Sequence, residues 1–166
     1  MALITFFFVQ KLWEPFTADN APTLVGKPKL FFIQACQGSR MDEGVTLNVV
    51  QKDSEVFASY KVPVHADFLI YHSTVAGYYS WRNTANGSWF VQSLASVLDD
   101  YSRQKRDLLT LLTIATKRVA IEYESSSSRK EYSNKKQTPF FYSTLRYKLF
   151  LEPKPIVQND KNLLEL

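Results

Sequence analysis

The hydrophobic pattern along the chain predicts three β-strands. Leu30 to Ile33 is a continuous apolar run, and Asp67 to Thr74 is a second one that follows Pro63. Short uninterrupted apolar runs of this kind are typical of strands buried on both faces. In Phe140 to Leu151, apolar residues nearly alternate with others over the second half. This pattern predicts a half-exposed strand, antiparallel to its neighbour and placed at an edge or an interface.

Two other segments have the apolar spacing of amphipathic helices. Ser88 can cap the first helix and Asp107 the second, because these side chains accept hydrogen bonds from the first backbone N–H groups. The apolar stripes are Phe90, Leu94, Val97 and Tyr101 in the first helix, and Leu108, Leu111, Leu112, Ala115 and Val119 in the second. A weaker pattern predicts a short helix from Lys11 to Phe16. Residues 42–60 and 125–137 are polar and are predicted to be exposed loops.

Strands separated by helices predict an α/β fold built on a layered sheet. In open α/β sheets, ligands bind beyond the carboxyl ends of the parallel strands. Cys36 lies just beyond the first predicted strand, and the aromatic-rich segment 77–89 lies just beyond the second. If the two strands are neighbours, the cysteine and the aromatic segment meet at one end of the sheet.

The composition excludes several classes of site. The chain has 166 residues, enough for one domain with a buried core, and it contains one cysteine and two histidines. An internal disulfide, a cysteine-rich zinc site and a three-histidine zinc site are therefore excluded. The five glycines form neither a dinucleotide-binding nor a phosphate-binding motif. We expect no metal and no cofactor.

Charge and hydropathy argue against nucleic acid and membrane partners. The net charge is +4, but the basic runs are short and interrupted, as on an ordinary solvated surface. The apolar residues 1–9 lack the basic start and the cleavage site of a signal peptide. They are also shorter than the roughly 20 residues of a membrane helix. We expect a reduced, cytoplasmic protein that binds neither nucleic acid nor membrane.

The most specific motif in the chain is Gln34-Ala35-Cys36-Gln37-Gly38. It matches the signature of the caspases, a family of cysteine proteases. The match continues, in the family's order, through Lys27 to Ile33, Ser73 to Asn83 and Gly87 to Phe90. The chain therefore resembles the caspases, most closely the effector caspases, from about residue 11 to about residue 153. The resemblance implies an α/β, caspase-like layered sheet with helices on both faces, lacking the amino-terminal strands of the family fold.

The resemblance implies that Cys36 is the catalytic nucleophile. A thiol needs a neighbouring base or positive field to become a thiolate at neutral pH, and caspases use a histidine followed by glycine. None of the 35 residues before Cys36 is a histidine, so we expect the chain alone to be inactive in peptide hydrolysis. His65 is expected at the far end of the second strand from the site. His72, near the carboxyl end, is expected to be a hydrogen-bonded core histidine.

The resemblance also implies a substrate site for aspartate. Caspases hold the aspartate carboxylate with two arginines and a glutamine, and Arg82 and Gln34 match one arginine and the glutamine. The planar guanidinium of arginine suits bidentate binding of a carboxylate. The second arginine has no counterpart in the chain.

Further substrate-binding residues follow from the same resemblance. The positions that match the family's groove are Tyr79, Ser80, Trp81, Asn83, Trp89 and Tyr132, of which Tyr79, Trp81 and Tyr132 match an apolar wall. For Trp89, packing in the core is an equally good interpretation. Ser126 and Ser128 stand where effector caspases often have aromatic residues, which weakens the far pocket.

The resemblance divides the chain into four segments. Residues 1–10 are a divergent apolar segment, 11–53 the carboxy-terminal part of a large caspase subunit, 54–153 a small subunit and 154–166 a tail. The large-subunit part is expected to be a truncated stub, which would leave the strand at Leu30 to Ile33 with an exposed edge. Asp53 lies where the family is cleaved during maturation.

Two main functional hypotheses follow. The first is a caspase-type cysteine endopeptidase that cleaves peptide or protein substrates after aspartate in apoptosis-type proteolysis, as a homodimer or as a heterodimer with another caspase. The alternative is a catalytically dead caspase fragment that binds and regulates an intact caspase. In the family the dimer forms through the final strand, here Phe140 to Leu151. A basic binding domain unrelated to proteolysis is a third and weaker hypothesis.

Overall fold

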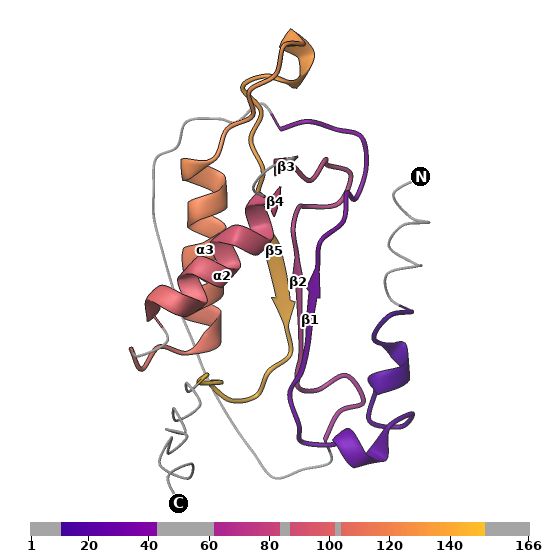
Figure 1. Ribbon diagram of the computed structural model, residues 1–166. Helices are drawn as coiled ribbons and strands as arrows, with labels where there is room; N and C mark the ends of the chain where they lie inside the picture. Colours follow the sequence, from indigo (N-terminus) through magenta and orange to yellow (C-terminus); the bar gives the residue numbers. More distant parts are fainter. Residues whose placement is uncertain (1–10, 43–61, 84–86, 102–103, 152–166) are drawn as a thin grey trace, which may run out of the picture.

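The computed structural model describes residues 11–42, 62–83, 87–101 and 104–151. Its centre is a three-stranded sheet of β1 (Lys29–Ile33), β2 (Phe68–His72) and β5 (Phe140–Ser143), in the order β1-β2-β5 (Figure 1). β1 runs parallel to β2, and β5 runs antiparallel to it. The short strands β3 (Arg82–Asn83) and β4 (Gly87–Ser88) pair with each other. The α/β fold expected from the pattern is confirmed.

The central strand β2 is buried along its whole length, as its apolar run predicts. Its side chains alternate between two clusters. Leu69 and Tyr71 pack against the helices, whereas Phe68 and Ile70 pack with Trp13 on the other face. Both faces of β2 are therefore covered, which explains why its sequence shows no polar alternation.

The edge strand β1 does not follow the same prediction. Phe32 is 43% exposed, and Leu30, Phe31 and Ile33 are only half-buried. Burial on both faces was therefore a wrong prediction for this strand. β1 has a partner on one side only among the described residues, so its side chains receive contacts from fewer neighbours.

The two helices form as the capping residues predict. α2 (Trp89–Tyr101) begins after Ser88, whose Oγ accepts a hydrogen bond from the Val91 N–H at 3.1 Å. α3 (Leu108–Glu122) begins after Asp107, which accepts hydrogen bonds from the N–H and the hydroxyl of Thr110 at 3.3 and 2.7 Å. Both predicted stripes face inward, and the helices pack together over one face of the sheet (Figure 1).

The other face is covered by a single-turn 3-10 helix, η1 (Glu14–Phe16). The helix expected over Lys11 to Phe16 is only a turn followed by η1, and η2 is Pro22–Leu24. Proline at the start of η1 supplies no N–H, so a longer helix could not run through it. Trp13 and Phe16 meet Phe31 edge to face. Among the described residues, the α-helices therefore lie over one face and η1 over the other.

The strand predicted over Phe140 to Leu151 is shorter than expected. β5 ends at Ser143, and the chain beyond it follows an irregular path. Leu145 and Leu149 still pack against the helix-side core, while Tyr147 and Leu151 are exposed. The predicted antiparallel, half-exposed character is confirmed, but the alternation after Ser143 reflects anchoring to the core rather than a strand.

None of the helices in the described parts of the chain is long and apolar enough to cross a membrane.

Candidate functional site

The candidate site is built on two loops that leave the same end of the sheet, one after β1 and one after β2 (Figure 1). Their first residues are joined through Ser73, which is fully buried. The Ser73 N–H donates to the Ile33 carbonyl at 3.0 Å. The Ser73 hydroxyl accepts from the Ala35 N–H at 3.2 Å and lies 3.1 Å from the Ala35 carbonyl oxygen. The backbone next to Cys36 is therefore held to the end of β2.

Further out, the two loops pair through their backbones. Gln37 donates to the Tyr78 carbonyl at 3.0 Å and accepts from the Gly77 N–H at 2.9 Å. Arg40 donates to the Gly77 carbonyl at 3.0 Å and accepts from the Tyr79 N–H at 2.7 Å. A Cβ on Gly38 would lie 2.3 Å from the Gly77 carbonyl oxygen, so this close pairing requires glycine.

Cys36 lies exposed beside Ser80. Its Sγ is 3.4 Å from the Ser80 backbone nitrogen and 3.6 Å from the Ser80 carbonyl oxygen. The Gln34 carboxamide donates to the Ser80 hydroxyl at 2.8 Å. The predicted meeting of the cysteine with the segment after β2 is confirmed.

A row of aromatic rings extends from this point. Tyr79, 42% exposed, lies 5.2 Å from Trp81 between ring centroids, and Trp81 stacks on Trp89 at 5.9 Å. Trp89 also contacts Tyr123 and is only 8% exposed, so it packs as a core residue at the start of α2. The row therefore presents an exposed apolar surface at Tyr79 and a fixed, buried end at Trp89.

Arg82 and Asn83 form the exposed strand β3, directly after Trp81. Their pairing with Ser88 and Gly87 fixes the backbone and leaves the Arg82 side chain on the surface. A guanidinium placed there can bind an anion through two parallel hydrogen bonds.

Tyr132 was also predicted to belong to the apolar wall of the groove. Tyr132 belongs to η3 (Lys130–Tyr132), in a loop closed by a 2.8 Å hydrogen bond from the Ser125 hydroxyl to the Tyr132 carbonyl. Within the described residues its ring makes no contact with the rings of Tyr79 or Trp81. Asp53 lies outside the described residues.

Sequence reasoning missed Gln137 and Ser73. The segment 125–137 was predicted to be an exposed loop, but Ser125 and Gln137 at its two ends are buried. The Gln137 carboxamide accepts from the Trp81 N–H at 2.6 Å and donates to the Ser73 carbonyl at 2.7 Å. A polar residue in a polar stretch carries no signal of burial, so no pattern could have identified it.

Neither histidine contacts Cys36. His72 is buried, its ring lies parallel to that of Phe140 at 4.9 Å, and burial lowers its pKa. A hydrogen-bonded core histidine was predicted. Its burial is confirmed, but its Nδ1 has no hydrogen-bond partner, so the predicted hydrogen bonding is not found at that atom. His65 precedes β2 and therefore lies at the opposite end of the sheet from the two loops.

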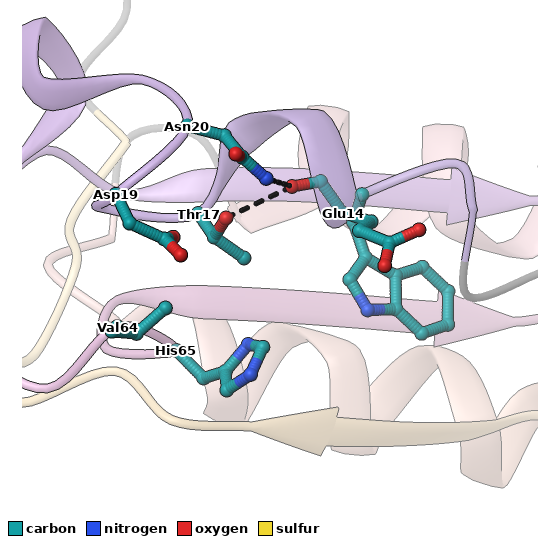
Figure 2. A pocket seen from close by; sticks show the side chains of 7 residues that line it. Glu14, Thr17, Asp19, Asn20, Val64 and His65 are labelled. Atoms are coloured by element: carbon teal, nitrogen blue, oxygen red, sulfur yellow. Dashed lines mark hydrogen bonds between the residues drawn. The ribbon is translucent and has the colours of Figure 1, made fainter.

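His65 lines a separate cavity of about 200 Å³ (Figure 2). Its other walls include Trp13, Asp19 and Val64. Thr17 and Asn20 close one side by donating to the Glu14 carbonyl, each at 2.9 Å. A separate hydrogen bond between the Thr17 side chain and the Asp19 carboxylate lowers the pKa of Asp19. The cavity contains none of the residues predicted for the site, and it lies near the amino end of β2.

Comparison with known proteins identifies the family of the chain. The family model of the caspase domain matches residues 4–150. Caspase-1 of Spodoptera frugiperda is 51% identical over 142 residues, which cover 85% of this chain and 47% of that protein. Caspase-7 of Gallus gallus is 45% identical over 146 residues, which cover 86% of this chain and 47% of that protein.

The fold agrees with this relationship. The crystal structure of Caspase-1 from Spodoptera frugiperda matches with a TM-score of 0.75 and 50% identity, over 87% of this chain and 54% of that one. The caspase-like fold expected from the motifs is thereby confirmed, and the chain spans about half the length of the relatives it matches. With a family model over most of its length and relatives of this identity, the chain belongs to the caspase family.

Proposed function

We propose that the chain carries the nucleophile and part of the aspartate site of a caspase-type cysteine endopeptidase, which cleaves protein substrates after aspartate in apoptosis-type proteolysis. The observation that carries this proposal is the arrangement around Ser80. Exposed Cys36 lies 3.4 Å from the Ser80 nitrogen, Gln34 donates to the Ser80 hydroxyl, and Arg82 is two residues further along.

The chemistry assigned to these residues is acyl transfer. The Cys36 thiolate attacks the carbonyl carbon of the substrate aspartate, the peptide C–N bond breaks, and a thioester remains on sulfur. The departing amine takes up a proton, and water then hydrolyses the thioester and restores the thiol. Gln34 and Arg82 bind the aspartate carboxylate, with Arg82 contributing the charge-assisted hydrogen bonds. Tyr79 and Trp81 offer an apolar surface to the neighbouring substrate side chain.

The general base is proposed to come from outside these 166 residues. His72 is buried against Phe140, and His65 lies at the other end of the sheet. A general base must lie within hydrogen-bond reach of the proton that it removes, or be joined to it by one water. Cys36 and the carboxylate-binding residues are thus one part of an active site that a histidine from another polypeptide segment completes.

An affinity-labelling experiment tests the proposal without requiring hydrolysis. The purified chain is treated with a tripeptide chloromethyl ketone ending in aspartate and with the matched reagent ending in asparagine. The thiolate displaces chloride directly, so no leaving amine has to be protonated. We expect Cys36 to be alkylated about tenfold faster by the aspartyl reagent, since a charge-assisted hydrogen bond contributes about 1.5–3 kcal/mol.

Mass spectrometry of the modified peptide identifies the labelled residue. Cys36→Ala is the control for the site of labelling, and Arg82→Gln should abolish the preference for aspartate while leaving the iodoacetamide rate unchanged. Equal rates for the two peptide reagents with the unsubstituted chain would rule out the proposed aspartate site.

A specific observation favours the second candidate function, a catalytically silent chain that binds an intact caspase. Neither of the two histidines of the chain lies beside Cys36, while the outer edge of β5 has no strand partner among the described residues. An exposed strand edge can pair with the strand of another chain. Association through β5 is compatible with both functions. The two are separated by measuring the activity of an intact caspase with and without this chain, because only the second function requires that activity to change.

A further inference from the structure

The buried side chain of Gln137 links the segment that carries Cys36 with the segment that carries Arg82. It is 1% exposed, and both ends of its carboxamide are used. Its Oε1 accepts from the Trp81 N–H at 2.6 Å, and its Nε2 donates to the Ser73 carbonyl at 2.7 Å. One rigid planar group therefore connects the segment leading into β3 with the end of β2.

Each of these two contacts leads on to a residue of the site. Ser73 is bonded through its hydroxyl to Ala35, the residue before Cys36. Trp81 is the residue before Arg82, and its ring is stacked on Trp89. Gln137 is thus linked through Ser73 to Ala35, the residue before Cys36. It also bonds Trp81, the residue before Arg82.

The neutral carboxamide of glutamine suits this pair of bonds. A carboxamide offers one donor and one acceptor at a fixed separation. Asparagine is one methylene shorter and cannot reach both partners, and methionine has the length but no N–H donor. Loss of the carboxamide leaves the Trp81 N–H and the Ser73 carbonyl unpaired beside a buried side chain, so the backbone must shift to recover partners.

We propose that Gln137 is a positioning residue that holds Arg82 at a fixed distance from Cys36. The inference rests on the proposed function, because the distance matters only if both residues act on one aspartyl group. A displacement of about 1 Å between two binding groups is enough to weaken productive binding strongly.

The experiment compares the full chain with Gln137→Met and, as a shorter amide, Gln137→Asn. The first measurement is the dependence of the Cys36 alkylation rate on the concentration of the aspartyl chloromethyl ketone. We expect the half-saturating concentration to rise about tenfold in Gln137→Met, the size expected for one or two lost hydrogen bonds. The limiting rate and the rate with iodoacetamide should change less than the half-saturating concentration, because the Ser73 hydroxyl still holds Ala35 next to Cys36.

The second measurement is hydrogen exchange at the Trp81 amide, which reports the contact directly. It should be about tenfold faster in Gln137→Met, with amides of α2 and α3 unchanged. Thr116→Val is the matched control, because it removes a hydrogen bond to the buried Tyr71 hydroxyl on the helix side. It should lower stability without changing the half-saturating concentration or the Trp81 exchange rate.

The two measurements separate the two proposals. If the unsubstituted chain does not prefer the aspartyl reagent, the proposed function fails and the positioning role fails with it. Faster Trp81 exchange in Gln137→Met would then show only that Gln137 holds the Trp81 backbone. Unchanged Trp81 exchange overturns the positioning role. It is also overturned if Thr116→Val raises the half-saturating concentration as much as Gln137→Met does, since a general loss of stability would then explain the effect. Gln137→Asn, which keeps one of the two bonds, should give an intermediate result.

Discussion

At the scale of single residues, Gly38 decides how closely the two loops approach. A Cβ there would lie 2.3, 2.4 and 2.6 Å from three backbone atoms of Gly77, which no change of rotamer can relieve. We expect Gly38→Ala to lower the free energy of unfolding by about 1–3 kcal/mol and to change the iodoacetamide rate at Cys36. Urea unfolding and alkylation kinetics measure the two effects.

Gly26 provides the matched control for this substitution. It has a φ of +73° but open space around a Cβ, so Gly26→Ala should cost about 1 kcal/mol through backbone strain alone. The iodoacetamide rate at Cys36 should not change. If the two variants behave alike, the steric explanation for Gly38 is wrong.

His72 makes the stability of the chain depend on pH. Burial lowers its pKa, so the unfolded chain binds a proton more readily than the folded one. Its stabilising contribution is therefore complete above about pH 6.5 and is lost as the pH falls below that value. Between pH 7 and pH 5 we expect stability to fall less in His72→Phe, which keeps the ring stack with Phe140, than in the unsubstituted chain.

Chemical unfolding at several pH values checks this expectation. The idea fails if His72→Phe has the same slope of stability against pH as the unsubstituted chain.

At the scale of elements, an ion pair ties the start of β2 to the chain beyond β5. Asp67 is buried with a φ of +66°, and two atoms of the Arg146 guanidinium bond its carboxylate at 2.9 and 2.6 Å. These hydrogen bonds lower the pKa of Asp67. Buried Lys29, which starts β1, adds a second positive charge nearby. The pair thus ties β2 to the chain beyond β5 at the end of the sheet opposite Cys36.

Arg146→Met should reduce the free energy of unfolding by about 1.5–3 kcal/mol at pH 7, because it leaves a buried carboxylate with fewer partners. The stabilisation from a lowered carboxyl pKa is complete above about pH 4 and disappears as the pH falls through the folded-state pKa. The difference between the variant and the unsubstituted chain should therefore shrink in acid, as urea unfolding at several pH values would measure.

Arg118→Met is the matched control at this scale. Arg118 binds Asp100 at 2.6 Å across α2 and α3, but the Asp100 side chain is 49% exposed. Solvent screens such a pair, so its loss should cost only about 0–1 kcal/mol. Equal losses for the two arginine variants would contradict the weight given to burial at Asp67.

At the scale of the whole molecule, the sheet ends in β1 on one side and β5 on the other among the described residues. Tyr142 of β5 is 43% exposed, whereas Leu145 packs against the helix-side core. A charge at Leu145 would therefore disturb folding, and Tyr142 is the better position at which to test association through β5.

Association through β5 is proposed above, and it should weaken at least tenfold in Tyr142→Lys, with an unchanged free energy of unfolding. A lysine on an exposed strand edge disfavours pairing with a second strand. Analytical ultracentrifugation measures the association. Ile121→Lys is the control, since Ile121 is also exposed but lies on α3. Association that is weakened equally by both variants would not involve β5.

Local signals account for what could be predicted. The caps at Ser88 and Asp107 and the apolar stripes of α2 and α3 depend on residues within a few positions of each other. The motif around Cys36 located the candidate site because it is contiguous in the chain. The burial of β1 and the length of β5 were mispredicted, because both depend on which other segments lie alongside.

The sequence by itself determined the family, the helices and the order of the chemically important residues, since each of these depends on residues that are close together in the chain. Only the tertiary structure decided that Gln137 bonds Ser73, that Ser73 holds the residue before Cys36, and that His72 stacks on Phe140. Those contacts join residues that are 38 or more positions apart or that come from different loops. Their geometry is set by the packing of the sheet, and no local pattern records it.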